Sequence, residues 1–134
     1  MPTHDNCAYH RQMTMIIAEP ESGRDEVAMT AAACLFHGFG DRSRLTILHH
    51  LLLGEHRVVE LTEHLGLAQS TVSKHLACLK DCGLVSSQPV GRASVFSVTH
   101  PEATSDLLIA AERLLGLTGY AVTLCPNHGV TARG

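Results

Sequence analysis

Hydrophobic positions along this chain change their spacing several times, and each change marks a new element. From Asp25 to Gly38 the apolar residues fall at helical spacing. Asp41 is a good N-cap for a second helix, whose leucines continue to Gly54. We expect these two helices to supply much of the core. Residues 1–24 follow neither a helical nor an alternating period, so they are expected to form a mobile N-terminal arm.

The middle of the chain has the pattern of two short helices followed by strands. The apolar spacing predicts a helix over 58–65 and a second over 69–81, joined by a turn that contains glycine. Residues 84–98 then change to the period of a β-hairpin, with its bend at Gly91. A last helix is predicted over 101–117. A helix-turn-helix followed by a hairpin is a winged helix, so the expected fold class is mainly α with a small β-hairpin.

Length and composition limit the class of protein. A chain of 134 residues is the size of one domain, and 45% hydrophobic residues suffice for a core. No run approaches the roughly 18 apolar residues of a membrane span, and the first residues lack the apolar block of a secretion signal. We therefore expect a cytoplasmic protein with no membrane partner, in which the predicted elements form one winged-helix domain over 25–118 followed by a tail over 119–134.

The distribution of charge permits DNA binding. The net charge of −3 disfavours a non-specific polyanion binder, but residues 67–94 carry three basic side chains and one acidic one. The helix predicted over 69–81 begins with small polar and amide side chains, which reach base edges and phosphates. The simpler alternative is a polar face that only contacts water. The expected DNA-contacting residues are Gln69, Ser70, Thr71, Ser73, Lys74, His75 and Arg92.

Five cysteines and ten histidines make the chain rich in soft and borderline metal ligands. Cys78 and Cys82 stand at i and i+4, which places their Cβ atoms about 5–6 Å apart on one helix face. Two sulfurs on a tetrahedral ion lie roughly 3.8 Å apart, so a chelate is feasible. A third thiol, Cys125, follows the last helix in a tail that Pro126 and Gly129 keep from being helical. In a dimer, such a tail would be able to supply the third sulfur to the other subunit.

Three segments, "FGDRSRLTILHHLL", "VVELTEHLGLAQSTVSKHLACLKDCGLV" and "VGRASVFSV", resemble the ArsR/SmtB metal-responsive winged-helix repressors of bacteria. The resemblance covers roughly residues 28–117. It implies a homodimer that binds a near-palindromic operator when metal-free and releases it when metal binds. Arg42 departs from the proline that the family often has there. The segment "VVELTEHL" lacks the paired cysteines of the arsenic- and cadmium-type site, and the last helix lacks the second histidine of the zinc-type site.

The cysteine pair in "HLACLKDCGL", together with one cysteine in the tail, is similar to the cadmium- and lead-sensing CmtR type within this family. This resemblance implies Cys78, Cys82 and Cys125 as metal ligands. Three thiolates favour a soft divalent ion, Cd(II), Pb(II) or Hg(II), as effector, with Zn(II) as a further candidate. Three more residues are candidate ligands, namely His128, Cys7 and His10.

Other interpretations of the same residues remain open. Oxidation of the cysteines would make a thiol-sensing winged-helix repressor, and a structural zinc module would also use them. An enzyme with Cys78 as nucleophile beside His75 needs a pocket and an oxyanion donor that the sequence does not indicate, so we expect no enzymatic activity. Cys34 lies in an apolar helical stripe and is expected to be a packing residue. Four histidines are expected at the helix surface, namely His49, His50, His56 and His64.

Overall fold

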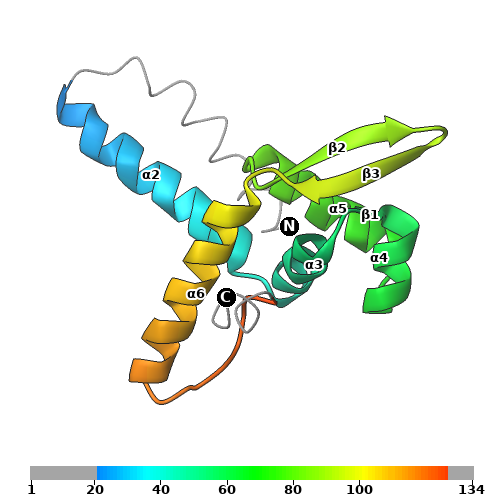
Figure 1. Cartoon of the computed structure of the whole chain (residues 1–134). Coiled ribbons are helices and arrows are strands. Elements are labelled where there is room, and N and C mark those ends of the chain that lie inside the picture. Colours follow the sequence, from blue (N-terminus) through cyan, green and yellow to red (C-terminus); the bar gives the residue numbers. More distant parts are fainter. Residues whose placement is uncertain (1–20, 127–134) are drawn as a thin grey trace.

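The computed structural model describes residues 21–126, and its elements follow the order of a winged helix (Figure 1). The prediction of a mobile arm falls mostly on residues 1–20, outside the described part of the chain. The elements are α2 (Glu21–Phe39), α3 (Arg42–Leu53), β1 (His56–Arg57), α4 (Val58–Leu65), α5 (Gln69–Asp81), β2 (Val85–Val90), β3 (Ala93–Val98) and α6 (Pro101–Leu117).

Most helix ends lie where the sequence predicts them. Asp41 caps α3, because its Oδ1 accepts the backbone N–H of Arg44 at 3.0 Å. Gly66 ends α4 in the left-handed conformation, with φ of 67°. The exception is α2, which begins at Glu21 rather than at Asp25. Residues 21–24 contain no apolar side chain, so the hydrophobic spacing gives no sign of this first turn. A carboxylate there is favourable beside the exposed N–H groups of a helix.

The sheet has three antiparallel strands in the order β1-β3-β2. The hairpin pairs Val85 with Val98 and closes at Val90 and Ala93. Strand β1 pairs His56 with Phe96. It was not predicted, because two residues are too short to show an alternating pattern. The hairpin behind a helix-turn-helix confirms the predicted winged helix.

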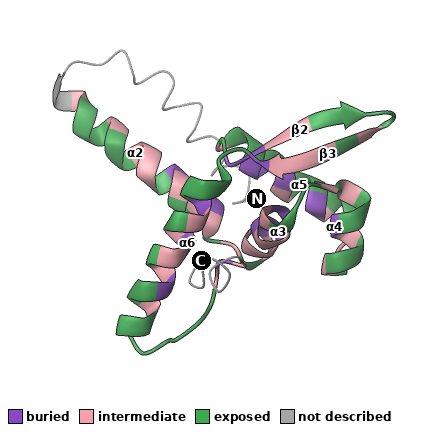
Figure 2. Cartoon of the chain, in the orientation of Figure 1, coloured by how far each residue is buried: buried purple, intermediate pink, exposed green. Residues whose placement is uncertain are grey.

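The core lies where α3, α4 and α5 pack against the base of the sheet (Figure 2). Its fully buried side chains come from all three helices: Ile47, Leu48, Leu61, Val72, Leu76 and Leu79. Helices α2 and α6 lie on the opposite side of this core from the projecting hairpin (Figure 1). Among the described residues, no helix combines the length and the apolar character that crossing a membrane requires.

Candidate nucleic-acid interface and thiol site

Helix α5 presents one polar face and one apolar face. Val72, Leu76 and Leu79 are buried against the core, which fixes the rotation of the helix about its axis. The opposite face at the N-terminal half is exposed, and Thr71 beside it is half-buried. Four of the residues expected to contact DNA lie exposed on this face: Gln69, Ser70, Ser73 and Lys74. The arrangement suits a helix whose N-terminal residues enter a DNA groove.

His75 differs from these residues because it turns toward the start of α3. Its Nε2 lies 3.9 Å from Oδ1 of Asp41, and its side chain is largely buried. Burial lowers the pKa of His75, although the neighbouring Asp41 carboxylate acts in the opposite direction. This position favours a packing contact between α3 and α5 over the base contact that the sequence suggested.

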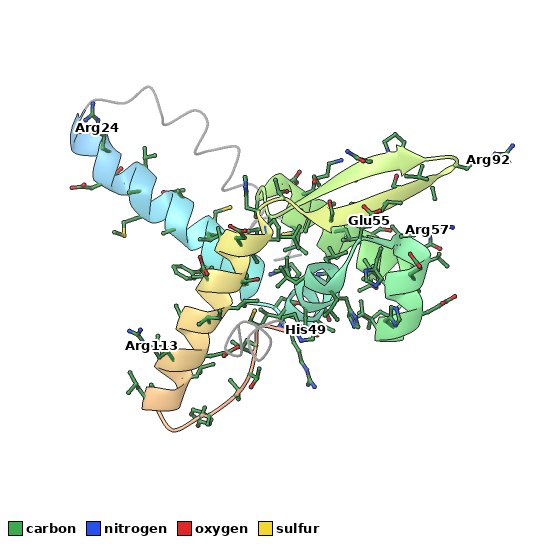
Figure 3. All side chains as sticks on the ribbon, viewed as in Figure 1. Arg24, His49, Glu55, Arg57, Arg92 and Arg113 are labelled. Carbon is green, nitrogen blue, oxygen red and sulfur yellow. The ribbon has the colours of Figure 1, made fainter. Side chains whose placement is uncertain are left out.

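The hairpin is hydrogen-bonded to α5, the second helix of the helix-turn-helix and its expected recognition helix. Nζ of Lys80 in α5 donates a hydrogen bond to Oγ of Ser87 in β2 at 2.8 Å. Arg92 is exposed at the tip of the hairpin, where its guanidinium extends away from the protein (Figure 3). A guanidinium in this position suits a phosphate or a minor-groove contact. Lys80 was not among the residues expected to have a specific role, because its partner is set by the packing of α5 on the sheet.

Two cysteines at the end of α5 lie beside a third from α2. Cys78 is 6% exposed and Cys34 is 4% exposed. Cys82, the C-cap residue, places its Sγ 3.4 Å from Sγ of Cys34. A hydrogen bond with the Cys78 side chain, burial, and a hydrogen bond with Cys34 raise the pKa of the Cys82 thiol far above its usual range. These contacts favour the neutral form of the Cys82 thiol.

Cys125 lies in a different place. After α6 the chain folds back, and Cys125 is 1% exposed. Oε2 of Glu112, which is 8% exposed, accepts the backbone N–H groups of Leu124 and Cys125 at 2.6 Å each. Within residues 21–126, no three His, Cys, Asp or Glu side chains are spaced to hold a metal ion. One protomer therefore does not bring Cys78, Cys82 and Cys125 together as ligands. The other candidate ligands, His128, Cys7 and His10, lie outside the described residues.

The four histidines predicted to lie at the helix surface form a cluster between α3, β1 and α4: His49, His50, His56 and His64. The rings of His50 and His64 are stacked with their centroids 5.0 Å apart. His56 lies 6.1 Å from His50, and His49 lies 6.2 Å from it. Burial and then the neighbouring rings, His64 first, lower the pKa of His50. Glu60 is an acidic group beside His56 and His64.

The histidine cluster predicts a loss of stability in mild acid. The pKa of His50 in the folded protein lies below that of a histidine in an unfolded chain, about 6.5, so the unfolded chain binds more protons at and below about pH 7. The free energy of unfolding should therefore decrease as the pH falls from about 7.5 to about 5.5, which urea titrations at each pH would measure. His50→Gln should reduce this pH dependence. The exposed His100, replaced in the same way, is the control, and equal slopes for both variants would contradict the prediction.

The known proteins that this chain resembles are bacterial transcriptional regulators. The profile described as "Bacterial regulatory protein, arsR family" matches residues 41–87. The chain is 38% identical over 100 residues to a probable mercury resistance operon repressor of Streptomyces lividans, covering 72% of this chain and 79% of that protein. It is 43% identical over 67 residues to the HTH-type transcriptional regulator CmtR of Mycobacterium tuberculosis, covering 50% of this chain and 57% of that protein.

A solved structure supports the fold alone. The homodimeric winged helix-turn-helix DNA-binding domain of Mb0332 from Mycobacterium bovis superposes with a TM-score of 0.61 at 22% identity, covering 74% of this chain and 94% of that one.

Proposed function

Because the chain belongs to the arsR family of bacterial regulatory proteins, we propose that it is a transcriptional repressor that releases its operator when a soft metal ion binds its cysteines. This membership confirms, at the level of the family, the resemblance of the three sequence segments. Members of the family are DNA-binding regulators and not enzymes. One observation carries the metal proposal: the thiols of Cys78 and Cys82 meet at the C-terminal end of α5. The exposed residues at the other end of this helix form the DNA-reading face, namely Gln69, Ser70, Ser73 and Lys74.

The proposed partner is a near-palindromic operator. A dimer would place its two α5 helices about 34–36 Å apart, which is one turn of DNA. Gln69, Ser70 and Ser73 would contact bases or phosphates, and Lys74 and Arg92 would release counterions from the phosphates. Thr71 and His75 are less exposed and lie behind this face.

Exposed apolar side chains support a homodimer. Helix α2 exposes Met29 and Phe36, while α6 exposes Leu114 and Leu117. These two helices lie away from the hairpin of β2 and β3 (Figure 1). Apolar side chains grouped on neighbouring surface helices are typical of a protein interface. A second copy of this chain is therefore the proposed occupant, and the pairing would leave both recognition helices free to contact DNA.

The proposed effector is Hg(II), Cd(II) or Pb(II), with Zn(II) as a further candidate, because thiolates prefer soft ions. Cys78 and Cys82 would hold it, and Cys125 of the second chain would complete the set. Since Glu112 holds Cys125 in its own protomer, the tail would have to leave that position before it reaches another site. The metal would bind more tightly to a conformation in which the tail and the recognition helix are displaced, and that conformation would bind the operator less tightly. The coupling free energy between metal and operator binding would be about 1–3 kcal/mol.

The test is fluorescence anisotropy of the operator from the protein's own promoter, with protein and then Hg(II), Cd(II), Pb(II) or Zn(II) added. The wild type should lose roughly 5–150-fold in DNA affinity with at least one ion. Cys78→Ser should keep its metal-free affinity and lose the response. Ala77→Ser, at the exposed neighbouring position, is the matched control and should respond like the wild type.

Two results would contradict the metal proposal. One is an unchanged DNA affinity in the presence of every ion. The other is release by peroxide in the presence of a chelator with no effect of any metal, which would favour the thiol-oxidation sensor instead.

A further inference from the structure

We propose that Cys34 of α2 is an additional thiolate ligand of the metal site at the end of α5, so that a bound soft ion joins α2 directly to the recognition helix. This inference rests on the proposed metal response and names a ligand from a second helix. It assigns a chemical role to a residue whose position in an apolar stripe indicated packing alone.

The distances around Cys82 carry the inference. Sγ of Cys82 lies 3.4 Å from Sγ of Cys34 and 3.9 Å from the carbonyl oxygen of Cys34. Two sulfurs that share a tetrahedral ion lie roughly 3.8 Å apart, since each metal–sulfur bond is about 2.3 Å. The pair from α2 and α5 therefore already stands at the spacing of shared ligands.

The backbone holds this junction in place. Gly38 of α2 packs so closely on the residues just after α5 that an added Cβ would lie 3.0 Å from Cδ1 of Leu84 and 4.0 Å from Sγ of Cys82. The guanidinium of Arg44 donates hydrogen bonds to the carbonyl oxygens of His37 and Gly38, at 2.8 and 3.1 Å. The Cys34 sulfur is thus presented by the packed end of a helix, which limits the rearrangement needed to bind an ion.

The chemistry of the group favours a ligand role over packing. The described residues contain four free cysteines, and one of them, Cys82, contacts both Cys34 and Cys78. A packing cysteine needs only apolar neighbours, whereas sulfurs in contact with one another match a soft cation. As they stand, the described side chains are not spaced to enclose an ion. Closing the three sulfurs around one ion would therefore require side-chain rotation or a small shift of α5 relative to α2, and the DNA-reading face lies on α5.

The experiment counts sulfur ligands on the full chain loaded with Cd(II) alone. X-ray absorption should find three sulfur neighbours in the double variant Cys7→Ser/Cys125→Ser, which retains only Cys34, Cys78 and Cys82, whereas a site without Cys34 would keep two. In an ultraviolet titration, Cys34→Ser should reduce the saturating thiolate-to-cadmium band by about a quarter to a third and weaken Cd(II) binding roughly tenfold or more. Ala33→Ser, at an exposed neighbouring position of α2, is the matched control and should leave both quantities unchanged.

The outcomes separate this inference from the proposed function. Two sulfurs in the double variant, or an unchanged band in Cys34→Ser and Cys34→Ala, would overturn the role of Cys34 even if metal still releases the operator. Three sulfurs in the double variant would support the role of Cys34 even if no metal alters DNA affinity, in which case only the repressor mechanism fails. The count in the double variant does not depend on whether the Cys34 variants fold.

Discussion

Glu112→Ala should release the segment after α6 and expose the thiol of Cys125. The Glu112 carboxylate accepts two backbone N–H groups, from Leu124 and Cys125, at 2.6 Å each. Hydrogen bonds to a charged group contribute about 1.5–3 kcal/mol each, so losing both should favour opening by about 3 kcal/mol or more. That free energy corresponds to a roughly hundredfold faster reaction of Cys125 with a thiol reagent. Labelling followed by mass spectrometry of the Cys125 peptide measures the rate.

Two further variants make this test specific. Glu112→Gln keeps an acceptor oxygen without the charge, so its labelling rate should be intermediate. Asp106→Ala removes an exposed carboxylate from the same helix and should behave like the wild type. Equal labelling of Cys125 in Glu112→Ala and in the wild type would show that the carboxylate does not hold the tail.

Arg44→Ala should lower the free energy of unfolding by about 3 kcal/mol. The side chain is only 3% exposed, and its Nε and Nη2 donate to the carbonyl oxygens of Gly38 and His37, which end α2. Without the guanidinium the Gly38 carbonyl loses this donor, and the His37 carbonyl keeps only the backbone N–H of Gly40 at 3.0 Å. A cation is also removed from the negative end of a helix. Urea denaturation followed by circular dichroism measures the change.

The matched control for Arg44 is Arg42, which lies in the same helix but is exposed. Arg42→Ala should change the free energy of unfolding by no more than about 0.5 kcal/mol. Arg44→Lys keeps the charge but not the forked donors, so it should recover only part of the loss. A loss in Arg44→Ala no larger than that in Arg42→Ala would mean that the hydrogen bonds at the end of α2 add little to stability.

Periodicity and caps determined the elements of this fold, because both are local properties of the chain. The helix over 69–81 and its polar face follow from the spacing of Val72, Leu76 and Leu79, and the structure places them as that spacing requires. Asp41 and Pro101 mark helix starts by their own chemistry. The helix-turn-helix, the hairpin and their resemblance to a family of repressors were therefore available from the sequence alone.

Only the tertiary structure decided which side chains meet across elements. Cys34 and Cys82 are separated by 48 positions, and no period links them. The same holds for Glu112 and the amide of Cys125, and for the stacked rings of His50 and His64. Such contacts depend on how one helix packs against another, because that packing sets the distance and direction of each side chain. The sequence determined the helices and the identity of the thiols, and the packing of α2 on α5 determined which thiols became neighbours.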